Sequence, residues 1–529
     1  MNSRSLSSSV LLICAAAACS VPSGTTPGAG AQKSVSVAEA PNPRGEELYL
    51  QHCSVCHGSR GHGDGPAAPH LLPPARRFES GGFRLVSSEN GAPSDADLVA
   101  TLRRGIPGSA MPAWSWLPDS DLESLAAHVR TLAIEGSSQE LATEARRAGE
   151  SLSSEQAQRL ARERMTPDRT IEAAASVPAD ATHLAAGRRV YLERCAQCHA
   201  SDGTGARTPR PNADGGLNWA RDFTAGFLKG GDSTLALTRR IRAGLPGSAM
   251  PPNRLDPADE AALVVYVQSL IPKGVADRLV HARSTLTARR VAVAPEDPDD
   301  PSWKTANTIR VVLAPLWWNE EAVLEASLSA LHDGETVALR LSWADATGDV
   351  RLFAESRASD GAALQLSSAK EPALFGMGAP HEPTNLWHWQ ALRVEDVEGA
   401  LDLVAPVPHA REPDRANEVR ADVPLYHRLL GRLEPSERAD QITVRGVETL
   451  PGANAVPGEV RAKAHWQDGR WSLVFRRALQ GPNAESKGDM VALVPGSPVQ
   501  VACAVWNGAA GDAGARKSIS IWQELLLER

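Results

Sequence analysis

Two short stretches of the chain place two cysteines and a histidine at positions i, i+3 and i+4. The stretches contain Cys53, Cys56 and His57, and Cys195, Cys198 and His199. On a helix these positions share one face, so two thiols and an imidazole project together. Such a set can attach a porphyrin through two thioethers while the adjacent imidazole binds its iron. The spacing therefore predicts two covalently bound haems of the c type.

A methionine follows each motif within a repeated Gly- and Pro-rich sequence. Met111 and Met250 occupy the same place in residues 105–112 and 244–251, although the chain has only six methionines. A thioether is a soft ligand that can close the sixth position of a haem iron and raise its potential. We expect Met111 and Met250 to be the second axial ligands, opposite His57 and His199. The alternative for both methionines is packing in a core.

Other chemistry could use the cysteine pairs. A single Cys-x-x-Cys can be a redox dithiol, and two pairs together can bind zinc. Neither alternative explains a histidine after each pair and a methionine loop further along. An iron with both axial positions occupied by protein has no open site for substrate, which favours electron transfer over catalysis. No catalytic residue is predicted.

The matching sequences also define an internal repeat. The pattern Gly-x-x-x-Tyr-x-x-x-Cys-x-x-Cys-His begins at Gly45 and again at Gly187. We expect two copies of one domain, residues 42–135 and 182–272, each closing with an amphipathic helix over 121–132 or 259–270. Residues 136–181 are polar and are predicted to be a linker with one surface helix.

The N-terminus resembles an export signal. A short apolar run follows Arg4, and Ala16-Ala17-Ala18-Cys19 loosely matches a lipobox, so residues 1–19 are predicted to be a signal peptide with Cys19 as a lipidation site. Plain cleavage is the alternative. Residues 20–41 read as a flexible tether. The formal net charge of −8 argues against nucleic-acid binding. The predicted signal peptide and lipobox match lead us to expect an exported, periplasmic protein tethered to the membrane by lipid.

The composition changes after a predicted linker at residues 273–294. Residues 295–529 contain most of the 13 tryptophans and several runs that alternate apolar and polar side chains, separated by Asp-Gly turns. This pattern predicts antiparallel strands in a mainly-β sandwich. The predicted fold class is multidomain, with two small all-α haem domains followed by the β-sandwich.

The repeated region resembles two tandem class I cytochrome c domains. The resemblance rests on Cys56-His57-Gly-Ser-Arg-Gly-His-Gly-Asp-Gly-Pro66 and on the shorter match that follows Cys198. It implies a small helical domain for each haem, with crossing N- and C-terminal helices. The second copy lacks the Gly-Asp-Gly-Pro sequence, so its haem-edge loop should differ. Ser94 and Asp97 are predicted to form a capping-box start for the helix before Met111.

Most of residues 300–529 resemble the haem b-binding γ subunit of ethylbenzene dehydrogenase, which serves molybdenum enzymes of the dimethyl sulfoxide reductase family. The matching strings are residues 375–380, 384–389, 501–508 and 516–522. The resemblance implies a non-covalent haem b with Met377 and Lys517 as axial ligands. A lysine ligand must be neutral, which burial favours.

Alternatives remain open at each of these positions. Met377 could fill the core, and Lys517 could be a solvated turn residue. His388 is a rival ligand or a packed histidine, on the opposite strand face from Trp387 and Trp389. Cys503 is expected to be a small buried apolar residue. Related sandwich domains also bind sugars, so haem b could have been lost.

These patterns lead to one principal functional hypothesis and two rivals. The principal one is an exported electron-transfer protein with two haems c and one haem b. It would relay electrons between a molybdenum-containing catalytic subunit, or an iron-sulfur subunit, and other respiratory electron carriers. The rivals are a haem enzyme of the peroxidase or oxidase type, and a redox sensor whose β-sandwich binds a small molecule. No dinucleotide-binding fingerprint is present.

Overall fold

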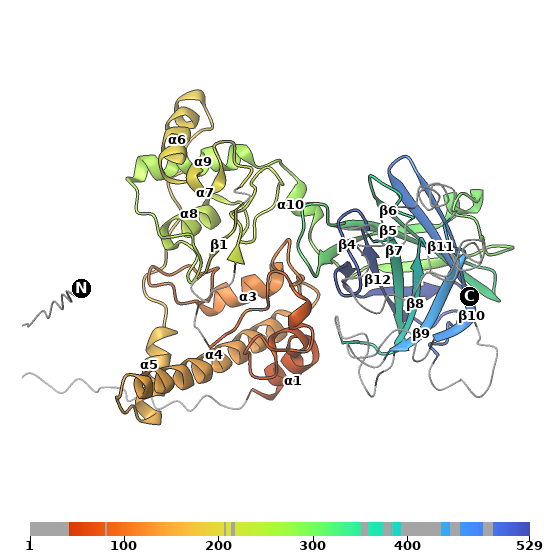
Figure 1. Ribbon diagram of the computed structural model, residues 1–529, viewed down its shortest axis with the longest axis horizontal. Helices are drawn as coiled ribbons and strands as arrows, with labels where there is room; N and C mark the ends of the chain where they lie inside the picture. Colours follow the sequence, from red (N-terminus) through yellow and green to blue (C-terminus); the bar gives the residue numbers. More distant parts are fainter. Residues whose placement is uncertain are drawn as a thin grey trace, which may run out of the picture. The chain divides into compact units, whose positions relative to one another are not determined.

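The computed structural model describes residues 42–79, 82–205, 208–212, 217–350, 358–373, 382, 384–392, 435–444, 455–479 and 490–529. The predicted signal peptide, tether and Cys19 lie outside the described residues, as does Met377. Helices dominate the first half of the described chain and strands the second (Figure 1). This order confirms the predicted multidomain class of helical cytochrome c domains followed by a mainly-β region.

The first helical module covers the first Cys-x-x-Cys-His motif and its methionine loop. Its elements are α1 (Pro43–His52), α2 (Ser54–His57), η1 (Ala68–His70), α3 (Asp95–Arg104) and α4 (Asp119–Arg147). The Asn42 side chain caps α1 by accepting a hydrogen bond from the Gly45 amide at 2.9 Å. At α3, Ser94 accepts from the Asp97 amide at 3.1 Å and Asp97 accepts from the Ser94 amide at 3.0 Å. The predicted capping box is therefore confirmed.

The second helical module repeats this arrangement. Its elements are α6 (Ala181–Arg194), α7 (Ala196–His199), β1 (Arg210–Pro211), β2 (Leu217–Asn218), α8 (Thr234–Ala243) and α9 (Pro257–Leu270), followed by α10 (Val275–Arg278). Asp180 caps α6 and Asp256 caps α9 through their side chains. The helix α9 closely matches the predicted helix over 259–270.

In both modules the first and last helices cross at a glycine. A Cβ atom on Gly45 would lie 2.3 Å from the Ser124 carbonyl oxygen of α4, and one on Gly187 would lie 2.1 Å from the Ala262 oxygen of α9. Only glycine permits backbones to approach this closely. The crossing of terminal helices implied by the resemblance is thus present in both copies.

The segment predicted as a linker at residues 136–181 is more ordered than expected. The helix α4 continues to Arg147 instead of ending at Leu132, and α5 (Ser154–Arg164) follows as a separate helix. Ala157 and Ala161 on α5 are buried, and α4 and α5 contact each other. Two small residues one turn apart allow close helix packing without a broad apolar stripe, which is why the sequence pattern missed it.

The mainly-β region begins earlier than predicted. Its strands are β3 (Thr285–Arg290), β4 (Asn307–Pro315), β5 (Glu325–His332), β6 (Thr336–Ala344), β7 (Gly361–Ser367), β8 (Thr384–Gln390), β9 (Arg438–Val444), β10 (Ala455–Gln467), β11 (Arg470–Ala478), β12 (Val499–Trp506), β13 (Ser518–Ser520) and β14 (Gln523–Leu527), with η2 (Pro301–Thr305) after β3. The strand β3 lies inside the predicted linker 273–294 and pairs in parallel with β14 and β5. The linker prediction is wrong there, because the partners of β3 lie far along the chain.

The strands β3 to β14 form one connected network, separate from the two-stranded sheet of β1 and β2. Their order is β13-β4-β5-β3-β14-β12-β7-β8-β9-β10-β11-β6, and further pairings join β5 to β6 and β12 to β13. The predicted two layers are therefore linked along their edges by hydrogen bonds. A two-residue turn joins β10 to β11, with Asp468 at φ +52° and Gly469 at φ +71°. This geometry suits a type I′ hairpin and confirms the Asp-Gly turn signal.

The β core is built on fully buried tryptophans. Trp343, Trp387, Trp389 and Trp471 are each 0% exposed. Trp387 and Trp389 share one face of β8, as the alternating pattern predicted, while His388 is half-buried on the other. Cys503 lies in the same core, in agreement with its expected role as a small apolar residue.

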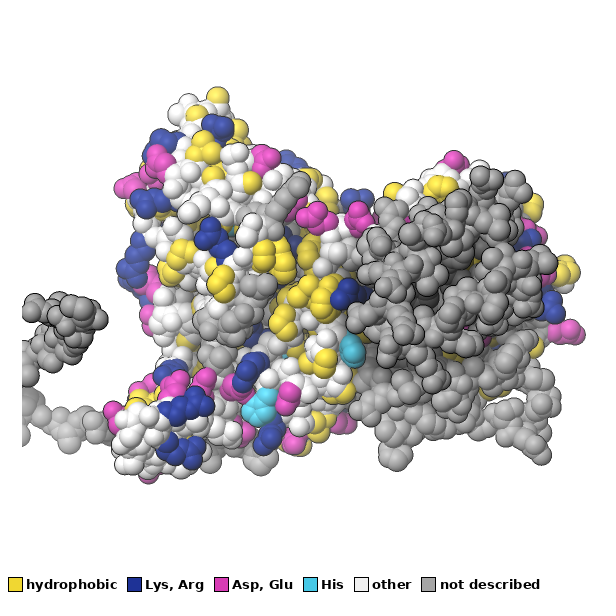
Figure 2. Space-filling view, in the orientation of Figure 1, with side chains coloured by type: hydrophobic (Ala, Val, Ile, Leu, Met, Phe, Trp, Pro, Cys, Tyr) yellow, Lys and Arg dark blue, Asp and Glu magenta, His cyan; other side chains and the backbone are white. Residues whose placement is uncertain are grey.

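The surface of the helical region is mixed in character. Basic and acidic side chains are interspersed over the face in view (Figure 2). Leu192 and Trp219 are among the exposed large hydrophobic side chains of the described chain. No helix in the described part combines the length and the apolar character needed to cross a membrane.

Candidate functional site

Each Cys-x-x-Cys-His motif lies on a single helical turn at the end of the module's first helix. In the first copy, the Cys53 amide donates to the Tyr49 oxygen at 2.8 Å, and the His57 amide to the Cys53 oxygen at 2.9 Å. In the second, the corresponding distances to Tyr191 and Cys195 are 2.8 and 3.0 Å. Helical geometry thus directs both thiols and the imidazole to one side of each turn, as the spacing predicts.

One nitrogen of each motif histidine is held by a backbone carbonyl. His57 Nδ1 lies 2.9 Å from the Arg76 oxygen, and His199 Nδ1 lies 3.1 Å from the Arg221 oxygen. Because a carbonyl only accepts, Nδ1 carries the proton in both rings and Nε2 keeps its lone pair. A hydrogen bond from the other ring nitrogen is the arrangement that orients histidine ligands toward a metal. Both histidines therefore fit an axial ligand of haem iron.

The surroundings of both imidazoles keep them neutral and fixed in position. Burial lowers the pKa of His57 and that of His199, which favours the unprotonated form that binds metals. Phe78 stacks on His57 with ring centres 4.8 Å apart, and Phe223 stacks on His199 at 4.6 Å. A phenylalanine thus fixes the plane of the imidazole ring in each copy.

A buried tyrosine fixes the chain immediately after each motif. The Tyr49 hydroxyl donates to the Gly58 oxygen at 2.7 Å, and the Tyr191 hydroxyl donates to the Ala200 oxygen at 2.8 Å. Burial raises the pKa of both tyrosines, so each remains a donor. The sequence repeat contained these tyrosines, but their role in holding the turn became apparent only in the structure.

The two methionine loops have the same hydrogen bonds. The Met111 oxygen accepts from the Ile106 amide at 2.9 Å, and the Met250 oxygen accepts from the Leu245 amide at 3.1 Å. A serine hydroxyl two residues earlier accepts from each methionine amide, at 3.3 and 3.2 Å respectively. The backbone therefore presents both methionines alike. Their axial role remains a prediction.

The cysteines do not resemble a redox pair or a zinc site. Burial raises the pKa of Cys53 and Cys56 to about 12 and that of Cys195 to about 11, whereas reactive dithiols need a lowered pKa. A four-cysteine zinc site requires both pairs to converge on one ion. Within the described ranges, the two pairs form no such group. The geometry favours separate attachment sites.

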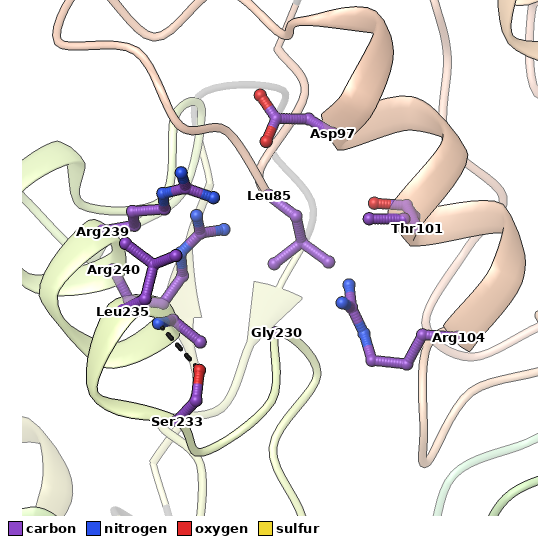
Figure 3. A pocket seen from close by; sticks show the side chains of 11 residues that line it. Leu85, Asp97, Thr101, Arg104, Gly230, Ser233, Leu235, Arg239 and Arg240 are labelled. Atoms are coloured by element: carbon purple, nitrogen blue, oxygen red, sulfur yellow. Dashed lines mark hydrogen bonds between the residues drawn. The ribbon is translucent and has the colours of Figure 1, made fainter. Parts of the chain in front are cut away.

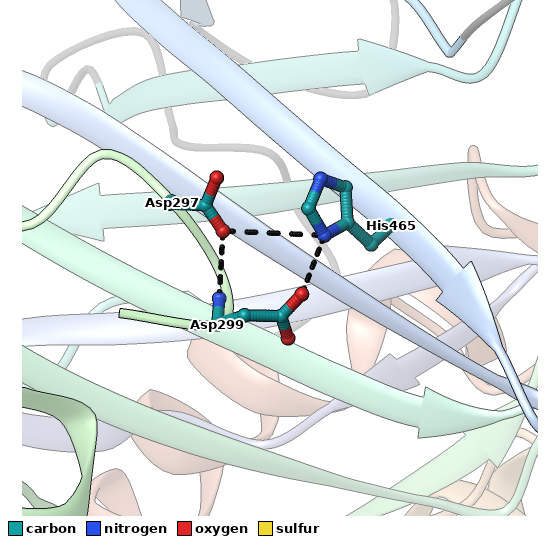
Figure 4. Close-up of side chains that lie close together, drawn as sticks. All are labelled: Asp297, Asp299 and His465. Atoms are coloured by element: carbon teal, nitrogen blue, oxygen red, sulfur yellow. Dashed lines mark hydrogen bonds and ion pairs between the residues drawn. The ribbon is translucent and has the colours of Figure 1, made fainter. Parts of the chain in front are cut away.

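One group of possible metal ligands does occur in the described part of the β region. Asp297, Asp299 and His465 lie close together, with His465 Nδ1 2.7 Å from an Asp299 oxygen (Figure 4). Lys463 Nζ lies 2.8 Å from an Asp297 carboxylate oxygen and supplies a positive charge. This side-chain cluster is therefore a partly exposed ion-pair network.

The predicted haem b residues are only partly placed. The Lys517 ammonium lies 4.8 Å from the centre of the Trp506 ring, and the His388 ring contacts the same tryptophan at 5.3 Å between centres. Burial lowers the pKa of Lys517 to about 8, toward the neutral form that a metal ligand needs. The structure brings Lys517 and His388 to one aromatic ring, and it does not describe Met377.

Sequence reasoning missed a group of buried carboxylates in the β region. Asp360 accepts hydrogen bonds from the Gly508 and Asp349 amides and from Trp471 Nε1, at 2.7, 2.6 and 2.9 Å. Burial raises the pKa of Asp360 to about 7 and that of Asp345 to about 6. Asp360 ties together three segments that are distant in sequence. Only its position before the glycine that starts β7 hinted at a turn role.

Comparison with known proteins matches all three regions to families. Residues 40–129 match the family model for cytochrome c oxidase, cbb3-type, subunit III, and residues 184–270 match cytochrome c. Residues 300–518 match the ethylbenzene dehydrogenase family model. The two cytochrome matches and the ethylbenzene dehydrogenase match agree with the resemblances seen in the sequence.

Individual relatives align with parts of the chain. A Haloferax mediterranei protein, provisionally named respiratory nitrate reductase heme subunit ORF7, is 25% identical over 277 residues, covering 50% of this chain and 82% of that protein. A Kuenenia stuttgartiensis reducing HAO-like protein complex chain is 26% identical over 44% of this chain and all of that one, with a TM-score of 0.37. A family 9 carbohydrate-binding module from Caldicellulosiruptor kristjanssonii is 9% identical over 46% of this chain and 94% of that one, at 0.26. TM-scores of this size establish neither fold nor function.

Proposed function

We propose that this chain is an exported multihaem electron-transfer protein. It relays electrons between a molybdenum-containing oxidoreductase and the respiratory chain. The observation that carries the proposal is the pair of motif histidines, each bonded through Nδ1 to a backbone carbonyl and each left with Nε2 for a metal. The cytochrome c family matches over residues 40–129 and 184–270 support the same role.

Each helical module would hold one haem c. Cys53 and Cys56 would attach the first haem, and Cys195 and Cys198 would attach the second. His57 and Met111 would bind the first iron, and His199 and Met250 would bind the second. When bound, a haem supplies a one-electron change at its iron. The protein fixes the imidazole plane by stacking and by the carbonyl bond, and it keeps the imidazole neutral by burial. With two protein ligands, each iron would have no position left for a substrate.

The β region would hold a third, non-covalent haem b. The ethylbenzene dehydrogenase match over residues 300–518 supports this, together with the lowered pKa of Lys517 beside Trp506. Lys517 and Met377 are the proposed axial pair, with His388 as the rival to Lys517. The Lys517 oxygen accepts from the Leu316 amide at 2.9 Å, and the Leu316 oxygen accepts from the Leu72 amide of the first module at 2.9 Å. Backbone bonds therefore connect the proposed haem b region to the first cytochrome module.

The proposed partners are the subunits of a respiratory oxidoreductase. The relative named as a heme subunit of a respiratory nitrate reductase supports a role as one subunit of an assembly. A molybdenum-containing catalytic subunit, an iron-sulfur subunit and other respiratory electron carriers are the proposed contacts. A lipid on Cys19 would tether the exported chain to a membrane.

Haem content tests this function directly. A pyridine haemochrome assay on the purified full-length protein, before and after acid–acetone extraction, separates covalent from extractable haem. We expect two covalent haems c and one extractable haem b per chain. Replacing Lys517 with Met should remove or alter the extractable haem while both covalent haems remain. A chain without covalent haem would refute the proposal, and one with no extractable haem would remove the third cofactor.

A further inference from the structure

The two cytochrome modules meet at a cavity lined by residues from both. The cavity has a volume of about 190 Å³, and α3 of the first module and α8 of the second contribute most of its walls. Arg104 extends from α3, while Arg239 and Arg240 extend from α8 toward the same space (Figure 3). Cationic side chains from both modules therefore gather along this seam.

Further cations lie along the seam. Arg221 donates from Nη2 to the Pro107 oxygen of the first module at 3.0 Å, and its guanidinium lies 4.4 Å from the centre of the Phe227 ring. Arg104 donates from Nε to the Lys229 oxygen at 3.1 Å. Arg221 and Lys229 belong to the second module, yet both contact the first. The positive charge is thus shared by the two modules.

Arg221, Arg104 and Arg240 donate to backbone carbonyls, and neither they nor Lys229 form an ion pair with a carboxylate of the described residues. Burial lowers the pKa of Lys229 to about 7, and the charged groups that lower it further are the guanidiniums of Arg221, Arg84 and Arg76. Burial also lowers the pKa of Arg221 and that of Arg240 to about 10, and Arg240 Nε is buried without a hydrogen-bond partner in the described chain. Several buried charges of one sign are costly unless an opposite charge accompanies them.

The nearest acidic side chains are already engaged. Asp97 accepts hydrogen bonds from the Ser87 amide and hydroxyl and from the Ser94 amide, within the cap of α3. Asp222 accepts from the Thr224 amide and hydroxyl. Within the described ranges, these two carboxylates cannot balance Lys229, Arg221, Arg104 and Arg240, which leaves the described part of the seam with a positive excess.

The seam is also connected to both motif histidines. The oxygen of Arg76 accepts from His57, and the oxygen of Arg221 accepts from His199. The residues that fix the two imidazoles are thus also among the cations that surround Lys229. An anionic group belonging to either haem would find opposite charge here. A haem carries two propionate carboxylates, and charged hydrogen bonds of this type are the stronger ones.

We infer that Lys229, Arg221, Arg104 and Arg240 form one anion-binding seam that receives propionate carboxylates from both haems and ties their two reduction potentials together. This inference rests on the proposed function, because it requires two bound haems. A nearby positive charge disfavours the extra positive charge of ferric iron and so raises the potential. Loss of one seam cation should therefore lower both potentials.

A redox titration of the full-length protein tests the seam. In Lys229→Met, both one-electron steps assigned to the haems c should shift to lower potential. We expect about a tenfold change in the ratio of reduced to oxidised haem at a fixed potential, which is about 59 mV for a one-electron couple. The control is Lys273→Met, which removes an exposed lysine of the same charge. A shift in only one step, or equal shifts in the control, would overturn the shared seam.

A second pair of variants keeps the test valid if Lys229→Met folds poorly. Arg221→Lys retains the charge and should keep both potentials, whereas Arg221→Leu should lower both. Both variants keep the backbone carbonyl that accepts from His199. Titrations in phosphate and in chloride at equal ionic strength distinguish haem carboxylates from a free anion. Potentials that follow phosphate would overturn the propionate assignment. A haemochrome count of two covalent haems in each variant separates failure of this inference from failure of the proposed function.

Discussion

The two cytochrome modules share the contacts around the proposed haem ligands, and they differ in the loops further along and in what packs against the methionine. Each keeps the bond from histidine Nδ1 to a carbonyl, the stacked phenylalanine, the buried tyrosine and the methionine turn. The chain directly after each motif makes equivalent bonds, from the Gly63 amide to the His57 oxygen at 2.8 Å and from the Gly205 amide to the His199 oxygen at 3.0 Å. The copies differ further along, where η1 stands in the first module and β1 and β2 stand in the second. The proposed haem ligation would account for this small set of shared contacts.

The modules differ most in what surrounds the methionine. Met111 packs against a buried cluster that contains Trp114 and also Ile521 and Trp522 from the β region. Met250 is absent from the corresponding buried cluster of the described second module. A more enclosed haem sits in a medium of lower dielectric, which destabilises the ferric charge. We therefore expect the first haem to have the higher potential.

The largest expected effect is the loss of one haem from one module. Cys53→Ser with Cys56→Ser should reduce covalent haem from two per chain to one, because serine cannot form the thioethers. Cys195→Ser with Cys198→Ser should do the same for the second module. The haemochrome assay counts the haems, and Cys503→Ala, which alters a buried core cysteine, should leave the count at two. Two haems remaining in either double variant would contradict the assignment.

Replacing each methionine in turn should show which module has which midpoint potential. Met111→Ala should lower the higher midpoint potential and Met250→Ala the lower one, because axial ligands account for much of the roughly 0.8 V range of haem potentials. A spectroelectrochemical titration measures both. Met490→Ala, in the β region, is the control. If Met250→Ala lowered the higher midpoint potential instead, the second haem and not the first would have the higher potential.

The smallest expected effect concerns the residue after each histidine. Gly58 has φ +75° and ψ 157°, and Ala200 has φ +60° and ψ 165°, a region that is essentially restricted to glycine. Ala200→Gly should stabilise the folded state by relieving strain of about 1–3 kcal/mol. The greater conformational entropy of glycine in the unfolded chain should offset about 0.4–1 kcal/mol of this gain. Gly58→Ala should destabilise its turn, because a Cβ would lie 1.9 Å from an Asp64 oxygen.

Amide hydrogen exchange over the two motif turns measures this difference. Protection should rise in Ala200→Gly and fall in Gly58→Ala, each within its own module. Unchanged exchange in both variants would show that the two turns tolerate this backbone conformation without strain.

The sequence predicted the fold best where the signal was local. The Ser94 cap, the Asp-Gly hairpin and the alternation that buries Trp387 depend on neighbouring residues, and all three occur in the structure. The strand β3 was missed because its partners are β14 and β5, which lie far away in the chain. The extent of α4 was missed because α5 covers it with small side chains.

The candidate site also has features that the local sequence predicted and features that it did not. Cys-x-x-Cys-His spacing alone predicted which residues share a helical face. Sequence reasoning missed the carbonyl partners of His57 and His199, although Arg76 and Arg221 stand in the same Ala-Arg-x-Phe string, residues 75–78 and 220–223. The string follows the histidine by a different number of residues in each copy, 19 and 22, so it falls outside the fixed offset of the repeated motif. The cation seam was equally hidden, since Lys229 and Arg104 meet only when the two modules pack.

The proposed electron-transfer role depends most on two haem irons whose axial positions are both occupied by protein side chains. Carbon monoxide added to the untreated, fully reduced protein tests this directly, because it binds ferrous haem only at an open axial position. We predict no change in the visible spectrum of the haems c at neutral pH, and a clear change in Met111→Ala and Met250→Ala. Carbon monoxide binding to the unaltered haems c would contradict the electron-transfer role and favour an enzyme.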